Sequence, residues 1–144
     1  MNATVVVNPA ARGGAHTRAA ERAVARLTTL GIATTTVSGA SAAESTALLR
    51  HAVSGGTDAV IVVGGDGIIN LALQEVAGTA TPLGVVPAGN GNDFAREFGI
   101  PELEPEIAAD IIAAGHTRTI DRARATRADG STAVFGTVLA SGFD

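Results

Sequence analysis

The run AVIVV at residues 59–63, which leads directly into two glycines, limits the fold of this chain more than any other feature. Its continuous apolar, β-branched character predicts a strand that is buried on both faces, because a half-exposed strand alternates apolar and polar residues. Such strands are typical of parallel sheets that helices cover on each side. The sequence therefore predicts an α/β fold with this strand near the centre of its sheet.

Strand-like and helix-like segments alternate along the rest of the chain. Short β-rich segments are expected at 4–7, 32–37, 59–63 and 83–86. Apolar residues at helical spacing predict helices at 16–30, 42–53, 68–76, 93–98 and 105–114. This alternation predicts a Rossmann-like parallel sheet with helices on both faces and right-handed crossovers. Beyond residue 117 two β-like runs, 118–126 and 132–140, flank an Asp-Gly turn that favours a β-hairpin.

Composition excludes several classes of function. The chain has 144 residues, a formal net charge of −4 and no cysteine, which excludes disulfides and thiol nucleophiles. All ten basic residues are arginine, which rules out a Walker A loop because that loop needs its lysine. An acidic chain with only four phenylalanines as aromatics also argues against a nucleic-acid binder. Since no apolar run is long enough to cross a bilayer and the N-terminus lacks signal-peptide features, we expect a cytoplasmic protein.

Three glycine-rich segments follow predicted strands: NPAARGG at 8–14, GGDG at 64–67 and PAGNGND at 87–93. In a parallel sheet such segments emerge at the same carboxyl edge, so we expect them to converge on one crevice. Glycine lets backbone N–H groups approach an anion closely, and a helix that starts there adds its positive end. The segments predict a site for a phosphate-bearing ligand, although none spells the dinucleotide-binding pattern GxGxxG.

An acid in such a loop needs an explanation. Asp66 would repel phosphate unless a divalent cation lies between them, or unless it accepts a proton or a hydrogen bond from an incoming hydroxyl. Both explanations belong to phosphoryl transfer, and the structural alternative is that Asp66 caps the helix starting at Gly67. Asp93 occurs in the same setting at the next loop, which makes capping a less sufficient explanation. Asn90 and Asn92 either donate to phosphate or ribose oxygens or occupy left-handed turn positions.

Taken together, these motifs resemble a known family. The segments VVGGDGIINLALQEVAGT, PLGVVPAGNGNDFAREFGIP, TIDRARA and FGTVLASGFD resemble, in this order, the catalytic domain of the diacylglycerol kinase family, bacterial lipid kinases related to sphingosine kinases and NAD kinases. The resemblance extends from VNPAARGG to the last residue. It implies ATP as phosphate donor, Mg²⁺ as cofactor and a lipid hydroxyl, such as that of diacylglycerol at the inner membrane surface, as acceptor. A homodimer is compatible with it.

The resemblance also implies roles for individual residues. It assigns catalysis to Asp66 and Asp93, and the metal site to Asp66, Asp93 and Asp121. It assigns nucleotide binding to the glycine-rich segments and to a hydroxyl after the second strand: Asn8, Pro9, Ala10, Ala11, Arg12, Ser38, Gly64, Gly65, Asp66, Gly67, Ile68, Ile69, Asn70, Leu71, Gly89, Asn90 and Asn92. On this interpretation Asp66→Asn abolishes phosphate transfer and leaves the fold and melting temperature nearly unchanged.

Family members are about twice as long, which implies a second domain. We expect residues 1–124 to form the nucleotide-binding α/β domain, and residues 125–144 to form a hairpin leading into a β-rich domain that is absent from this chain. That domain would carry the general base, a structural Mg²⁺ site and much of the lipid cleft, so the isolated chain is expected to lack turnover. The sequence also departs from the family at Ile68 and Asn90, where threonine is usual, and at Leu71, where glutamate is common.

Several alternatives stay open. The acceptor is a diacylglycerol-like lipid, a sphingoid base or NAD, and a nucleotide-binding module without transfer activity would fit the three departures. The stripe of arginines at 18, 22 and 26 is either a solvated helix face or a contact for anionic lipid headgroups. Phe94 and Phe98 are expected to be core contacts, with lipid contact as the alternative. The three histidines lack metal-ligand spacing and receive no role.

Overall fold

The structure of the chain, a computed structural model, describes residues 1–8, 14–89, 91–117, 123–126, 128–130 and 132–135. The first four strands are β1 (Asn2–Val7), β2 (Ala33–Ser38), β3 (Ala59–Gly64) and β4 (Leu83–Pro87). The helices are α1 (Ala15–Thr29), α2 (Ala42–Ser54), α3 (Asp66–Val76), α4 (Asp93–Glu97) and α5 (Pro105–Ala113). These bounds confirm the strands and helices expected before residue 115, with shifts of at most two residues at their ends.

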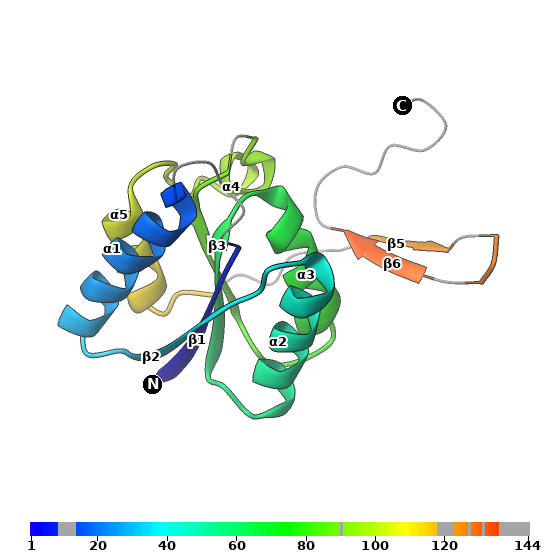
Figure 1. Cartoon of the computed structure of the whole chain (residues 1–144), viewed down its shortest axis with the longest axis horizontal. Helices are drawn as coiled ribbons and strands as arrows, with labels where there is room; N and C mark the ends of the chain where they lie inside the picture. The colour runs from blue at the N-terminus through cyan, green and yellow to red at the C-terminus, as the bar shows by residue number, and fades with distance from the viewer. Residues whose placement is uncertain (9–13, 90, 118–122, 127, 131, 136–144) are drawn as a thin grey trace.

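The four strands form one parallel sheet in the order β2-β1-β3-β4. α1 and α5 cover one face of this sheet, and α2 and α3 cover the other (Figure 1). α1 takes the chain from β1 to β2, and α2 then returns it past β1 to β3 along the opposite face. The structure therefore confirms the predicted parallel α/β sheet, and it places the reversal of strand order between β1 and β3.

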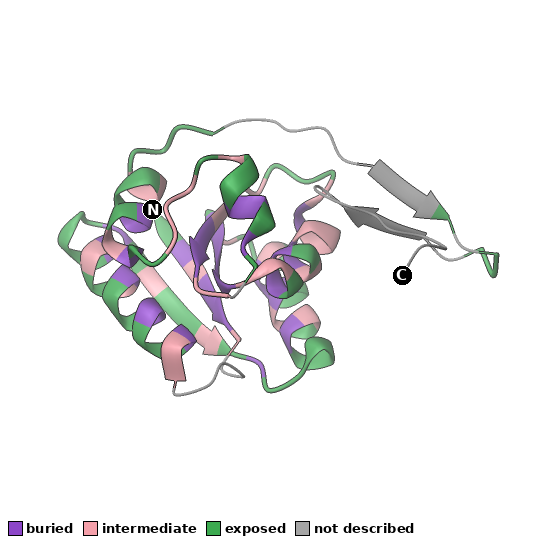
Figure 2. Cartoon of the chain, turned by 90° about the horizontal axis from the view of Figure 1, so that it is seen from above, coloured by how far each residue is buried: buried purple, intermediate pink, exposed green. Residues whose placement is uncertain are grey.

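β3 is buried along its whole length, as the AVIVV run predicted. It pairs with β1 on one side and β4 on the other, so it has no free edge. Its residues alternate between two cores: Ile61 and Val63 pack under α1 and α5, whereas Val60 and Val62 pack under α2 and α3. Figure 2 shows the buried strands lying between helices that are exposed on their outer sides. Edge strand β2, by contrast, contains no buried residue.

Two helix starts show how local sequence sets the element bounds. Before α2 the hydroxyl of Ser41 accepts the N–H of Glu44 at 3.1 Å, and the Glu44 side chain accepts the N–H of Ala40 at 2.6 Å. This arrangement is a close relative of the reciprocal capping box. α3 starts at Asp66, two residues before the apolar pattern indicated. The apolar pattern marks only the buried face, whereas an acid in the first turn is favoured by the positive end of the helix.

The contact between α1 and α5, here called the α1–α5 seam, is bridged by ion pairs. Nε and Nη2 of Arg22 donate to the two carboxylate oxygens of Glu106 at 2.7 and 2.6 Å, and Nε of Arg26 lies 2.6 Å from Asp110. The hydrogen bonds between Arg22 and Glu106 raise the pKa of the arginine and lower the pKa of the carboxyl. Two arginines of the predicted stripe are thus engaged within the fold, which argues against their use for lipid headgroups.

A second, two-stranded sheet follows α5. β5 (Ala123–Thr126) and β6 (Thr132–Phe135) pair antiparallel, with Ala123 opposite Phe135 and Thr126 opposite Thr132. The expectation that this pair leads into a second domain stays a prediction. Among the residues that the structure describes, no helix is long and apolar enough to cross a membrane.

Candidate functional site

The candidate site lies at the carboxyl edge of the sheet, where β1 and β3 end side by side. Asn8 follows β1 and Gly64 ends β3, and the N–H of Asn8 lies 3.4 Å from the carbonyl oxygen of Val63. The helices that follow these strands, α1 and α3, leave toward opposite faces of the sheet. A reversal of this kind opens a crevice between the two strand ends, which is where open α/β sheets bind ligands.

The second and third glycine-rich segments touch backbone to backbone beside this crevice. A Cβ atom added to Gly89 would lie only 2.4 Å from Cα of Gly65, so no side chain fits at position 89. A Cβ atom added to Gly65 would lie 3.1 Å from Cα of Gly89, which is also tight. The N–H of Ala88 donates to the carbonyl of Gly64 at 2.9 Å and continues the β3–β4 ladder up to this contact. The predicted convergence of these two segments is present.

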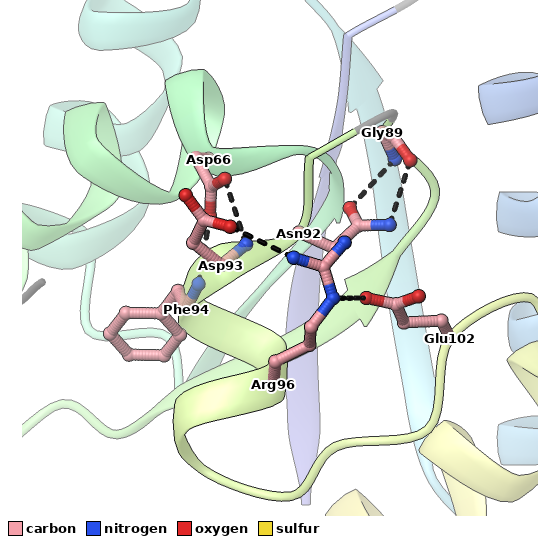
Figure 3. Close-up of polar contacts among 7 residues, drawn as sticks. All are labelled: Asp66, Gly89, Asn92, Asp93, Phe94, Arg96 and Glu102. Carbon is pink, nitrogen blue, oxygen red and sulfur yellow. Dashed lines mark hydrogen bonds and ion pairs between the residues drawn. The ribbon is translucent and has the colours of Figure 1, made fainter.

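Asp66 connects the same two segments through hydrogen bonds. Its two carboxylate oxygens accept the backbone N–H groups of Asp93 and Phe94, each at 2.9 Å (Figure 3). These amides belong to the first turn of α4, so Asp66 caps a helix, as the structural alternative proposed, but the helix is α4 rather than its own α3. Replacing the carboxylate by an amide would remove one of the two acceptors. The geometry therefore contradicts the expectation that Asp66→Asn leaves the melting temperature nearly unchanged.

Asn92 fixes the shape of the third segment. Its backbone is left-handed, with φ 54° and ψ 37°, as expected for asparagine in a turn. Its side-chain oxygen accepts the N–H of Gly89 at 3.0 Å, and its amide nitrogen donates to the carbonyl of Gly89 at 2.7 Å (Figure 3). The side chain is 3% exposed and spends both polar atoms on the loop itself. Its observed contacts thus give it a positioning role, not the direct nucleotide contact that the resemblance implied.

Asp93 differs from Asp66 in its surroundings. Its side chain is 64% exposed, and its carboxylate pairs with Nη1 of Arg96 at 2.9 Å, one turn along α4. Nε of the same arginine lies 3.0 Å from Glu102, so Arg96 bridges α4 and the segment before α5 (Figure 3). Asp93 therefore remains accessible to a ligand, and Arg96 partly balances its charge.

The residues after Gly67 are helical, and most of them face the core. Ile68 and Ile69 are buried, and Leu71 packs against the same core between α3 and the sheet. Only Asn70 of this group is exposed. A nucleotide could reach this segment through Gly64–Gly67 and Asn70, but not through the side chains of the two isoleucines. Since Ile68 and Leu71 serve the core, two of the three departures from the family are packing solutions.

The remaining residues assigned to the site are less closely grouped. Ser38 ends the edge strand β2 in register with Val7, so β1 separates it from β3 and from Asp66. The other residues lie outside the described part of the chain: Pro9, Ala10, Ala11, Arg12, Asn90 and Asp121. Their assigned roles therefore stay predictions.

The described residues fit a magnesium site of the usual kind only in part. Mg²⁺ is commonly held by one or two carboxylates together with phosphate oxygens and water. Asp93 is exposed, and each oxygen of Asp66 takes a single N–H, so both carboxylates keep capacity for a further ligand. The described residues contain no group of three or more acidic or histidine side chains that would form a metal site without a ligand. A cation here would therefore depend on the phosphates that it accompanies.

Sequence reasoning overlooked two residues that shape this edge, His16 and Arg96. The imidazole of His16 is buried, and its Nδ1 lies 2.6 Å from the carbonyl oxygen of Asn8. A signal for it was present, because position 16 falls on the same face of α1 as the buried Ala19, Ala20 and Ala23. Arg96 carried no such signal, since its partners Asp93 and Glu102 have no distinctive spacing.

Comparison with known proteins identifies the family. Residues 2–125 match the family described as diacylglycerol kinase catalytic domain. The chain is 49% identical over 141 residues to a diacylglycerol kinase of Mycobacterium tuberculosis, covering 98% of this chain and 46% of that protein. It is 31% identical over 121 residues to a diacylglycerol kinase of Bacillus subtilis, covering 83% of this chain and 40% of that protein.

Solved structures agree with this result. A crystal structure of a diacylglycerol kinase from Bacillus anthracis superposes with a TM-score of 0.72 at 26% identity, covering 84% of this chain and 44% of that chain. The present chain thus spans less than half the length of each of these relatives. Because the family match extends over most of its residues, the chain belongs to the diacylglycerol kinase catalytic domain family.

Proposed function

We propose that the complete protein is an ATP-dependent lipid kinase that transfers the γ-phosphate to the hydroxyl of diacylglycerol or a similar lipid and so makes phosphatidic acid. One observation carries the proposal: two glycine-rich segments meet backbone to backbone at the carboxyl edge, with Asp66 and Asp93 beside the contact. Membership of the family supports the same reaction class. Because the chain covers less than half of its relatives, the proposal concerns the whole protein.

The phosphates of ATP would be bound at the start of α3. The first N–H groups of a helix lack partners inside the helix, and they carry its positive end. Gly67 lies in this first turn, and an added Cβ there would meet no atom within 4 Å. This open helix start supports close approach of an anion. The left-handed Asn92 and the Gly65–Gly89 contact hold the neighbouring loop in place before the nucleotide arrives, which lowers the entropic cost of binding.

Asp66 and Asp93 would divide the remaining tasks. Asp66 fixes α4 against the glycine loop through its two backbone hydrogen bonds. Asp93, which these bonds hold in place, projects to solvent and would face the phosphates together with the free acceptor capacity of Asp66. These two residues would hold Mg²⁺, which supplies neutralisation of the phosphate charge when it is bound. Arg96 would keep the Asp93 carboxylate oriented when no nucleotide is present.

The acceptor side of the reaction lies beyond the described residues. In the transfer the lipid hydroxyl oxygen bonds to the γ-phosphorus, the bond to the β–γ bridging oxygen breaks, and ADP leaves. The hydroxyl proton must pass to a base, which we place in a β-rich second domain that follows residues 125–144. The lipid is part of a bilayer, so the reaction would take place at a membrane surface.

The test is phosphate transfer from radiolabelled ATP with Mg²⁺ to diacylglycerol, sphingosine and NAD in parallel, by the protein expressed from its complete reading frame. We expect labelled phosphatidic acid as the main product. Asp93→Asn should abolish most of the transfer, whereas Asp110→Asn, which alters an exposed carboxylate of the α1–α5 seam, should retain it.

The same assay separates the alternatives. Labelled sphingosine phosphate or NADP would assign a related kinase to the fold and reject the diacylglycerol proposal. No transfer to any acceptor, with ATP binding intact, would instead favour a nucleotide-binding module that performs no chemistry. Equal transfer by the wild type and Asp93→Asn would remove the exposed carboxylate from the mechanism.

A further inference from the structure

His16 is a buried ionisable side chain that the proposed function leaves unused. Among the residues that the structure describes, three polar side chains are buried: His16, Ser45 and Asn92. His16 lies in the first turn of α1 and is 8% exposed. Histidine in the first turn is not a favourable choice for the helix dipole, which prefers an acid there. The position is therefore better explained by the contacts of the imidazole.

The imidazole connects the two ends of the first glycine-rich segment. Its Nδ1 lies 2.6 Å from the carbonyl oxygen of Asn8, the last residue before the segment 9–13. A carbonyl oxygen only accepts, so Nδ1 carries the proton and donates it. Gly14 follows the segment, adopts a left-handed conformation and caps α1, two residues before His16. This single hydrogen bond therefore closes the segment at its base.

The same ring lies against the end of β3. A Cβ atom added to Gly64 would be 3.7 Å from both Cε1 and Nδ1 of His16, which is ordinary contact distance. That atom would also lie 2.8 Å from Cγ2 of Ile68, so the site has no room for a side chain at position 64. His16 thus touches the ends of both β1 and β3, the two strands between which the chain reverses direction.

We propose that His16 is a positioning residue that fastens the 8–14 segment for nucleotide binding. Resting on the proposed function, this inference assigns the segment to the phosphates of ATP and His16 to its preorganisation. A loop held at its base loses less conformational freedom when the ligand binds, so the fastening appears in nucleotide affinity more than in the chemical step. A histidine that merely filled space would be replaceable by an apolar residue of similar size.

Substitutions at position 16 separate the hydrogen bond from the packing. His16→Leu keeps much of the volume and removes the donor. His16→Asn keeps an N–H donor close to the place of Nδ1, and His16→Gln moves that donor one bond further out. His51→Asn, on the exposed side of α2, is the matched control. All variants should be made in the protein expressed from its complete reading frame.

Two measurements decide the inference: the Kd for Mg·ATP and hydrogen–deuterium exchange of the peptide covering residues 8–15 without nucleotide. His16→Leu should raise the Kd about ten-fold, the factor expected for one hydrogen bond, and should speed exchange in this peptide. His16→Asn should restore most of both values, His16→Gln less, and His51→Asn should match the wild type. The kcat for transfer should change less than the KM for ATP.

Other results would overturn the inference. If the Leu and Asn variants behave alike, the hydrogen bond has no role and His16 only packs. If His16→Leu lowers the melting temperature but leaves the Kd and the exchange unchanged, its role is general stability. A wild-type protein that binds no ATP would overturn the proposed function and the nucleotide part of this inference together. The exchange comparison would then still decide whether His16 fastens the segment.

Discussion

Asp66 and Glu106 are both carboxylates that accept two N–H donors, but the donors are of different kinds. Asp66 binds the backbone amides of Asp93 and Phe94, at the carboxyl edge of the sheet. Glu106 binds two nitrogens of the exposed Arg22 side chain, at shorter distances, in the α1–α5 seam. A guanidinium group that loses its partner turns to water, whereas a backbone amide cannot do so without opening its helix. The longer hydrogen bonds of Asp66 are therefore the less replaceable ones.

Packing at the two places differs in the same way. At the carboxyl edge Gly65 meets Gly89 through main-chain atoms, so neither residue can be enlarged without moving a loop. At the seam the two helices are bridged by long side chains that have other rotamers. Main-chain contacts fix the geometry of the candidate site, and side-chain contacts merely close the seam. The three substitutions below test this difference, from the largest expected effect to the smallest.

Gly89→Ala should have the largest effect on stability. The new methyl group would lie 2.4 Å from Cα of Gly65, so one of the two loops must shift. Overpacking of this kind costs about 1–3 kcal/mol, and sometimes more. Gly67→Ala is the matched control, because its methyl group meets nothing within 4 Å and alanine favours a helix by about 0.5–1 kcal/mol. Urea unfolding of both variants measures the difference, and equal stability would show that the loop contact yields easily.

Asp66→Asn should have the next largest effect. The amide retains one acceptor oxygen, but its NH₂ group would face the second backbone N–H of α4 and leave that donor unpaired. We expect a loss of about 1–3 kcal/mol in the free energy of unfolding. Asp93→Asn changes only an exposed ion pair with Arg96 and should cost less than about 1 kcal/mol.

Comparing these two variants separates structure from chemistry. Both should lower phosphate transfer if both acids serve the reaction, but only Asp66→Asn should lower the melting temperature. A melting temperature of Asp66→Asn equal to that of the wild type would remove the link to α4 from the account of the site.

The fold was predictable because its signals are local. The apolar run at 59–63 identified the central strand, and helical spacing with terminal glycines identified α1 and α2. The family was likewise predictable, because the order of its motifs along the chain is distinctive. The position of each loop at one sheet edge then followed from the parallel topology.

The contacts within the site were not predictable, because their partners are backbone groups distant in sequence. Asp66 attracted attention as an acid among glycines, but nothing in the sequence marks the amides of residues 93 and 94 as its donors. The turn alternative for Asn92 was the correct one, as its left-handed backbone shows. His16 was dismissed because it lacked metal-ligand spacing, although it occupied an apolar helix face. Polar residues on a predicted core face therefore deserve a search for a backbone partner.

Glu106→Gln should have the smallest effect, and one that depends on pH and salt. The hydrogen bonds from Arg22, and then that from its own backbone amide, hold the pKa of Glu106 below its ordinary value of 4.5. A carboxyl group with a lowered pKa in the folded state adds stability above its unfolded pKa, and loses it as the pH falls through the folded value. The difference in unfolding free energy between the wild type and Glu106→Gln should therefore be small at neutral pH and vanish in acid. Added salt should also reduce it, because the pair is exposed. The destabilisation by Gly89→Ala is steric and should respond to neither condition; a seam difference as insensitive to salt as that would mean that the α1–α5 seam is as rigid as the carboxyl edge.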